Sequence, residues 1–463
     1  MSVAKELAKY AIDLKFEDLP QEVIHQTKRV MLDTIGCAIG GYSSDASQMI
    51  QKTVTELGGK EESTVIGSGI KTSCLNAALA NGAMVRYLDY NDTAFIIQGE
   101  TYRTGYHPSE IMPPVLSVCE RDNLPGKDAI TAIVAGYDLS LSFLEGVTGT
   151  GMEKKGWNGD TRGAYIMPIV IGKLLGLDAD QMTNAVGIAG SCHAVLAILD
   201  TAAEVYTMTK NLRFPTMAYG GILAAFLARN GFTGPPRVIE GHDGFIKAVM
   251  NGEYDIKTFD TLKGKFAIME TCIKSIIADF SSHGHLTATL TLARENNINP
   301  DDVAKIKVTT SARCANHTGD IAKKYPQNKE SADHSSYYLT AIAIVDKEIG
   351  PDQFTPEKYN LPIVKELIDK VELIGDPSLD KERPAGLSEI TLKDGTVYNT
   401  KCQYPIGHAR NPMTDEQVAD KFKNMAEKYM DDKQMDNLIE TIFDLDKIDD
   451  VGKLNQLMVF KNQ

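Results

Sequence analysis

The stretch PQEVIHQTKRVMLDTIGCAI, residues 20–39, indicates the fold class of this chain. Its apolar side chains, among them Val23, Ile24 and Met31, recur mostly at the spacing of one helix face, and Pro20 stands where a helix can begin. The same spacing predicts further helices at residues 81–90, 113–120, 127–144, 163–175, 179–190 and 217–229. Several of these segments are rich in Gly, Ala and Ser, which lets helices approach closely. We therefore expect a mostly α protein with an all-α core.

The pattern changes between about residue 265 and residue 400. The run VAKIKVTTS at residues 303–311 alternates apolar and polar side chains, as a half-buried strand does. Asp394-Gly395 lies between two alternating runs in LSEITLKDGTVYNT, a pattern typical of a β-hairpin. Farther on, Thr414 and Gln417 have the spacing of a capping box and predict a return to helix. The sequence thus predicts a smaller α+β region within a helical chain.

The composition is that of a globular protein with a large core. The chain has 463 residues, 43% hydrophobic and 24% charged, which favours two domains. No basic N-terminal region precedes an apolar run, and no apolar run reaches about 18 residues, so we expect a cytoplasmic protein that does not enter a membrane. The net charge of −14 argues against nucleic-acid binding. It also means that a polycarboxylate ligand would need a local cationic cluster.

Several common motifs are absent. The segment GMEKKGWN at residues 151–158 has the glycine spacing of a phosphate-binding loop, but Trp157 stands where that loop requires lysine. Neither a dinucleotide fingerprint nor His-Glu-x-x-His occurs. The seven cysteines include no Cys-x-x-Cys pair, which excludes an aconitase-like iron–sulfur hydratase, and we expect reduced, mostly buried thiols.

Residues 88–110, LDYNDTAFIIQGETYRTGYHPSE, concentrate acidic, hydroxyl and imidazole groups. If the preceding helix continues through the start of this segment, Asp89 and Thr93 lie four positions apart on one face. His107 follows a loop that contains Gly and Tyr. We expect an acid, a hydroxyl and a base to meet at one cavity. Alternatively, Asp92 caps a turn and His107 caps the following helix.

Two further segments place charged groups among small or apolar residues. Lys210 and Arg213 precede a Gly- and Ala-rich helix, and Lys274 lies between isoleucines in CIKSIIADFSSHGHL, residues 272–286. A buried lysine is paired or functional, although a lysine in such surroundings can also extend to solvent. Because these cations occur together with Asp89, we favour a functional site over lysines that extend to solvent.

A metal site is the alternative that these residues leave open. His283-x-His285 could bind a metal if it lay on a strand. Asp89, Asp92 and His107 could form an oxygen-rich site.

The sequence resembles the MmgE/PrpD family, which includes 2-methylcitrate dehydratases and cis-aconitate decarboxylases, over nearly its whole length. LDYNDT, HPSEIMPPVLSV and KESADHSSYYLTAIAIVD carry part of the resemblance, the last matching an Ala-x-His-Ser pattern. The other matches are MLDTIGCAIGG (31–41), GKLLGLDADQMTNAVGIAG (172–190), AAFLARNGFTGP (224–235) and YPIGHARNPMTDEQVADKF (404–422).

The resemblance implies a domain architecture, an oligomeric state and a cofactor-free reaction. It implies a large all-α helical domain built from both chain ends, residues 1–265 and 405–463, with a smaller α+β lid domain inserted at residues 266–404. It also implies a homodimer formed through the helical domains, and a reaction without metal or organic cofactor. Helices that are apolar on more than one side agree with a dimer.

Carried over residue by residue, the resemblance also implies a catalytic set. Asp279 falls where dehydratases tend to have Glu and decarboxylases have His, which favours dehydration. The catalytic positions that match the family are Asp89, Thr93, His107, Lys210, Lys274 and Asp279.

This sequence departs from the family at two places near the expected cavity. Family members usually carry a His in the segment that here reads GWNGDTRGAY, and we expect Trp157, Asp160 or Arg162 to fill that space. A longer insertion before His107 brings Arg103 to the expected cavity mouth. The further candidates for substrate binding are Arg213 and His283.

These groups suit β-elimination from a hydroxy-polycarboxylate such as 2-methylcitrate. A base would remove a proton next to a carboxylate while Lys210 and Lys274 stabilise the developing charge. We expect His107 to exchange the proton, with Asp89 fixing its orientation and favouring its charged form. The alternatives are decarboxylation of the cis-aconitate type, epimerisation of a small dicarboxylate and, outside enzymes, a helical interaction protein on a degenerate scaffold.

Overall fold

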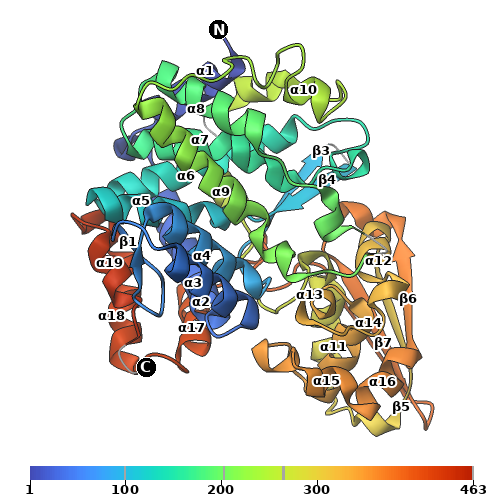
Figure 1. Ribbon diagram of the computed structural model, residues 1–463. Coiled ribbons are helices and arrows are strands. Elements are labelled where there is room, and N and C mark those ends of the chain that lie inside the picture. Colours follow the sequence, from blue (N-terminus) through green and yellow to red (C-terminus); the bar gives the residue numbers. More distant parts are fainter. Residues whose placement is uncertain (99–100, 202–203, 263–265, 461–463) are drawn as a thin grey trace.

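The computed structural model describes residues 1–98, 101–201, 204–262 and 266–460. Across these ranges the chain is mostly helical with small sheets, so the predicted fold class is confirmed at this level (Figure 1). Among the described residues, none of the helices is both long and apolar enough to cross a membrane.

The larger hydrophobic core draws on both ends of the chain. It combines residues such as Leu7 and Val30 with Val418, Leu438 and Leu454. The helices around it are α1 (Val3–Asp13), α2 (Gln21–Gly41), α3 (Asp45–Leu57), α4 (Cys74–Tyr87), α5 (Met112–Asp122), α6 (Gly126–Glu145), α7 (Gly163–Leu174), α8 (Ala179–Cys192), α9 (Arg213–Arg229), α10 (Phe245–Ala248), α17 (Asp415–Ala426), α18 (Asp432–Phe443) and α19 (Gly452–Leu457).

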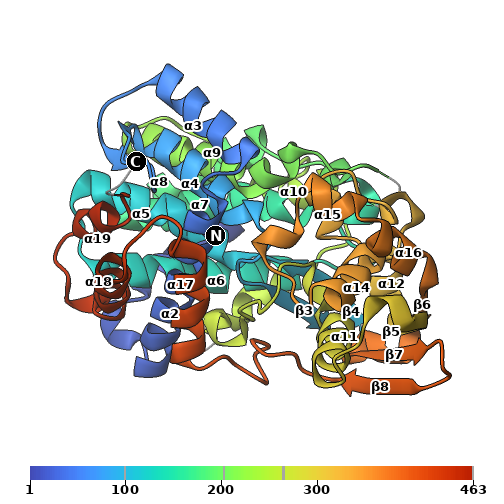
Figure 2. The same cartoon turned by 90° about the horizontal axis from the view of Figure 1, so that it is seen from below.

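Helix α17 packs directly against α2, although almost four hundred residues separate them (Figures 1 and 2). The predicted capping box starts α17, because Thr414 accepts from the backbone N–H of Gln417 and the Gln417 side chain accepts from that of Thr414. Lys421 of α17 forms a buried ion pair of 2.5 Å with Asp33 of α2. The C-terminal segment therefore completes a core that the N-terminal helices begin.

A second hydrophobic core is built from residues between Ile276 and Ile390. Its sheet has the strand order β6-β5-β7-β8, with β5 parallel to β6 and antiparallel to β7. The elements around this core are α11 (His283–Glu295), β5 (Val303–Ser311), α12 (Ala312–Thr318), α13 (Lys329–Ala332), α14 (Ser336–Val345), α15 (Pro356–Asn360), α16 (Pro362–Lys370), β6 (Val371–Asp376), β7 (Gly386–Leu392) and β8 (Val397–Cys402). We propose that the two cores correspond to the helical and lid domains.

The strand and the hairpin predicted in this region are both present. In β5 the pairing register shifts between Val303 and Lys305, which explains why Val303 and Ile306 are both buried although three positions separate them. Strands β7 and β8 pair across the turn at Asp394-Gly395, where Gly395 has a φ of +90°.

Two local predictions in the segment before His107 are wrong. Helix α4 ends at Tyr87, and Asp89 has a left-handed φ of +51°, so Asp89 and Thr93 do not share a helix face. In place of a loop, the segment contains an antiparallel pair, β3 (Ala94–Gln98) and β4 (Thr101–Tyr106). Thr93 itself pairs with Cys272, which brings the segment beside Lys274.

All seven cysteines are free thiols, and five of them are buried; Cys192 is exposed and Cys402 is half-buried. The expectation of reduced, mostly buried thiols agrees with this arrangement.

Candidate functional site

A cavity of about 400 Å³ lies between residues of the two cores. The helical side contributes segments near residues 86–107, 150–160 and 197–213, and the other side contributes segments near residues 279–281, 313–317 and 334. Its charged, imidazole and hydroxyl side chains include Arg86, Thr93, His107, Asp160, Asp200, Arg213, Asp279, His317 and His334. Three other cavities in the described part of the chain gather fewer groups able to transfer protons.

Asp89 is the centre of a buried ion cluster beside this cavity. Its carboxylate accepts from Arg86 at 2.8 Å, from Lys274 at 2.6 Å and from Lys210 at 3.1 Å. All four side chains are at most 2% exposed. The lysine side chains therefore do not extend to solvent, and the predicted convergence of Asp89, Lys210 and Lys274 is what the geometry shows.

The electrostatics of this cluster keep Asp89 ionised. Burial by itself would raise the pKa of Asp89, but Arg86, Lys274 and Lys210 hold it well below its ordinary value. Burial lowers the pKa of Lys274, and Asp89 opposes that effect. Neither lysine lines the cavity, so a direct contact between either ammonium and a substrate stays a prediction.

His107 lies at the cavity with a fixed tautomer. Its Nδ1 donates to the backbone carbonyl of Asp92 at 2.7 Å, which leaves Nε2 as an acceptor, 3.8 Å from Asp89. The Asp92 carboxylate accepts from the Ser109 N–H at 3.0 Å and from the Tyr137 hydroxyl at 2.8 Å. Asp92 thus organises the turn that precedes η2 (Pro108–Ile111), whereas the His107 side chain makes no cap bond.

Asp89 favours the charged form of His107, as expected, but stronger influences favour the neutral form. Burial, together with the positive charges of Arg86 and Lys274, lowers the pKa of the imidazole well below its ordinary value. Asp89 acts in the opposite direction, but it is already shared among three cations. His107 is therefore a neutral imidazole at neutral pH, and the Asp92 carbonyl rather than Asp89 fixes its orientation.

Sequence reasoning missed four residues that line the cavity, Arg86, Asp200, His317 and His334, and His334 is the most central of them. Its Nδ1 donates to Asp333 at 2.5 Å, and Asp333 also accepts from Lys329 at 2.7 Å and from Lys210 at 3.1 Å. The other ring nitrogen, Nε2, lies 3.5 Å from Asp89 and 4.0 Å from both Asp200 and Asp279. The available signal was the Asp-His pair inside KESADHSS, a segment that already carried the family resemblance.

Asp279 and His317 complete this wall of the cavity. Asp279 begins η9 (Phe280–Ser282) and accepts from the Ser281 N–H at 3.0 Å through Oδ1. Burial would raise the pKa of Asp279, but His317 and His334 lower it to about 2. His317, from α12, stands edge-on to His334 with the ring centroids 5.6 Å apart.

Arginine and aspartate fill the position where the family His is missing. Asp160, in η4 (Gly159–Arg162), pairs with Arg162 and lies 3.1 Å from Nε of Arg213. Arg213 also pairs with Asp200 at the end of η5 (Ala197–Asp200). Burial would raise the pKa of Asp160, but Arg213 and Arg162 lower it. Of the residues expected to fill this space, Asp160 lines the cavity.

Two of the predicted binding residues, Trp157 and His283, do not line the cavity. Trp157 packs against the larger core and does not line the cavity. His283 is fully buried against Phe280, with ring centroids 4.5 Å apart, because it opens α11 and faces inward. The side chain of Arg103 lies outside the described residues. Thr93 and Arg213 do line the cavity.

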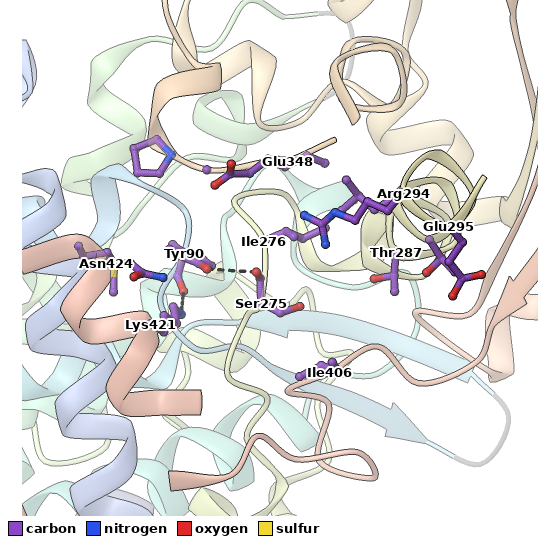
Figure 3. Close-up of a pocket in the computed structure, with 16 residues that line it drawn as sticks. Tyr90, Ser275, Ile276, Thr287, Arg294, Glu295, Glu348, Ile406, Lys421 and Asn424 are labelled. Carbon is purple, nitrogen blue, oxygen red and sulfur yellow. Dashed lines mark hydrogen bonds between the residues drawn. The ribbon is translucent and has the colours of Figure 1, made fainter. Parts of the chain in front are cut away.

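A second cavity, of about 470 Å³, adjoins the same ion cluster from Tyr90 and Ser275 (Figure 3). These residues follow Asp89 and Lys274 in sequence, and the Tyr90 hydroxyl donates to the Ser275 carbonyl at 3.1 Å. Lys421 donates to the Tyr90 carbonyl at 2.8 Å. The described lining of this cavity includes no histidine or aspartate, so it lacks the acid–base groups of the first cavity.

The proposed metal site at His283-x-His285 required both residues to lie on a strand. They belong instead to helix α11, so this site is not formed. Two other groups have donor atoms within 4.8 Å of one another, Asp89–Asp333–His334 and Asp200–His317–His334.

Comparison with known proteins assigns the chain to a family. The MmgE/PrpD N-terminal domain matches residues 5–257 and the MmgE/PrpD C-terminal domain matches residues 278–445. The cis-aconitate decarboxylase of Homo sapiens is 27% identical over 478 residues, covering 99% of this chain and 94% of the relative, and that of Aspergillus terreus is 25% identical over 479 residues, covering 98% and 96%. The 2-methylcitrate dehydratase of Escherichia coli (strain K12) is 24% identical over 447 residues, covering 89% and 88%. The chain belongs to the MmgE/PrpD family.

Proposed function

We propose that this protein is a hydro-lyase that dehydrates a hydroxy-polycarboxylate such as 2-methylcitrate by acid–base β-elimination. The observation that carries the proposal is that two imidazoles, His107 and His334, line one cavity and are each fixed through Nδ1 by a protein acceptor. Both kinds of family relative named above are lyases that act on related substrates.

His107 is the proposed general base. A neutral imidazole with its Nδ1 proton held by the Asp92 carbonyl presents an unshared electron pair at Nε2. That nitrogen can take the proton next to a substrate carboxylate. Asp89, 3.8 Å away, then stabilises the imidazolium that forms.

His334 is the proposed general acid. Oxygens of three carboxylates, Asp89, Asp200 and Asp279, lie within 4.0 Å of its Nε2. An imidazolium there can donate a proton to the departing hydroxide, which leaves as water. Elimination needs both a base and an acid, and the two rings supply one each.

Arg86 and Arg213 are the proposed carboxylate-binding residues of the cavity. Both guanidinium groups line it, and a guanidinium can hold a carboxylate through two parallel hydrogen bonds. Their acidic partners, Asp89 for Arg86 and Asp160 with Asp200 for Arg213, fix the direction of each side chain. The net charge of −14 repels a polycarboxylate at long range, and these two guanidinium groups would attract it at short range.

The test is to incubate the purified chain with citrate, 2-methylcitrate and cis-aconitate, and to follow the absorbance of new carbon–carbon double bonds together with carbon dioxide release. We expect absorbance to rise with a hydroxy-polycarboxylate and without carbon dioxide. His334→Asn should abolish the rise, and His242→Ala, which removes a side chain 87% exposed, serves as the control. Full turnover by His334→Asn would contradict the proposed acid.

Decarboxylation of the cis-aconitate type is the second candidate. It is favoured by the extent of the matches, because the cis-aconitate decarboxylases named above cover 98–99% of this chain and the dehydratase covers 89%. Carbon dioxide release from cis-aconitate, with loss of absorbance, would establish this activity and replace the first proposal.

A further inference from the structure

We propose that Asp200, His317 and His334 form a binding site for one divalent transition-metal ion such as Zn²⁺ or Co²⁺. Each residue offers one donor atom, and these atoms lie within 4.8 Å of one another. Two imidazoles and a carboxylate are a donor set that suits zinc, cobalt and ferrous iron. All three residues line the cavity, so an ion can reach them from solvent.

The second observation is an unsatisfied oxygen. Asp200 Oδ1 is shielded from solvent and has no hydrogen-bond partner among the residues that the structure describes, although Asp200 Oδ2 accepts from Arg213. A buried carboxylate oxygen without a donor is costly. This oxygen lies 4.0 Å from Nε2 of His334, on the side where an ion would contact both.

The two imidazoles are prepared for coordination. The Nδ1 of His334 donates to Asp333, and such a carboxylate–histidine pair is the common support of a metal-binding imidazole. His317 stands edge-on to His334 with the ring centroids 5.6 Å apart, and both rings line the cavity.

The alternative donor group, Asp89–Asp333–His334, is less suited to an ion. Asp89 already accepts from Arg86, Lys210 and Lys274, and Asp333 accepts from Lys210 and Lys329. These five hydrogen bonds would oppose a further cation. Asp279 instead adds negative charge beside the proposed site, because Asp279 Oδ2 lies 4.0 Å from Nε2 of His334. A His334 imidazolium, the form proposed above for the general acid, cannot bind a metal through the same nitrogen, so metal binding and proton donation by Nε2 exclude each other.

The test uses the full chain, freed of metal with EDTA and desalted, and titrated with Co²⁺ under visible absorption and with Zn²⁺ under calorimetry. We expect one ion per chain and Co²⁺ bands without a thiolate charge-transfer band. His317→Ala should weaken the affinity by at least about 100-fold, and Asp333→Asn should weaken it by about 10–100-fold, as loss of a supporting carboxylate does. Asp200→Asn provides a variant that leaves both imidazoles and their supports in place.

The control is His242→Ala, because His242 and Asp243 form an exposed pair that could bind metal weakly. It should leave the affinity unchanged. Absence of one-to-one binding, or equal affinity in the parent chain, His317→Ala and Asp200→Asn with unchanged thermal unfolding, would overturn the site. Because the readout is binding, the result does not depend on which substrate the protein converts.

Discussion

Replacing Asp89 by Asn should destabilise the protein strongly. The substitution keeps the shape of the side chain and removes a negative charge that three buried cations share. Lys210 keeps Asp333 at 3.1 Å, and Arg86 keeps Glu110 at 3.6 Å. Lys274 loses the carboxylate that it contacts and retains two backbone carbonyls, those of residue 89 and Ala278.

The structure therefore predicts the cost of one broken buried ion pair rather than of three. Removing one partner of such a pair costs about 3–5 kcal/mol of unfolding free energy. Lys274→Met should cost less, because Asp89 still accepts from Arg86 and Lys210. In the double variant no orphan ammonium remains, so its stability should lie close to that of Lys274→Met alone.

The assay is urea unfolding of the four proteins at pH 7, followed by near-ultraviolet circular dichroism and by fluorescence. The pKa of Asp89 is lowered in the folded chain, so its contribution is present above the pKa of an unfolded aspartate and is lost as the pH falls through the lowered value. The loss of unfolding free energy in Asp89→Asn should therefore be the same at pH 7 and at pH 6.

The matched control is Asp243→Asn, an exposed carboxylate paired with Lys247, which should leave the unfolding midpoint unchanged. Additive effects of Asp89→Asn and Lys274→Met, within about 0.5 kcal/mol, would refute the reasoning, because additivity means that the two side chains are not coupled.

Four further predictions follow from the site and the fold. His107→Ala should lower kcat about 100-fold or more with a modest change in KM, and near-normal turnover would rule out His107 as the base. Because the pKa of His107 is lowered, kcat/KM should keep its plateau down through pH 6.5 and fall only at lower pH; an acid limb centred at 6.5 would contradict this. Zn²⁺ should inhibit turnover and EDTA should restore it, since the ion would bind Nε2 of His334. Full activity at saturating Zn²⁺ would mean that the bound ion does not occupy the general acid. Light scattering at micromolar concentration should give about 100 kDa, twice the chain mass of 50.6 kDa, and a monomer would exclude the predicted homodimer.

Much of the fold could be predicted because its signals are local. Helical periodicity, the capping box at Thr414 and the turn at Asp394-Gly395 each depend on a few neighbouring residues. The prediction that a helix continues through Asp89 was wrong. Thr93 pairs with Cys272, and this contact between segments distant in sequence determines the backbone there.

The candidate site could be predicted only in part. The residues of segment 88–110 pointed to Asp89 and His107, and the resemblance added Asp279. His334 needed the fold, since Asp333 and the cavity give its ring a direction. The neutral state of His107 likewise depends on charges from Arg86 and Lys274, which sequence spacing does not place. His283 does not line the cavity, because it points from the start of α11 into the protein interior and is fully buried.

The packing of α17 against α2 also constrains the order in which a growing chain can fold. Asp33 and the surrounding face of α2 leave the ribosome long before Lys421, the partner that neutralises Asp33 in the finished protein. The intervening residues form a hydrophobic core of their own and can assemble before α17 is made. During synthesis the N-terminal helices therefore keep one apolar face and the Asp33 carboxylate uncovered until α17 packs against α2.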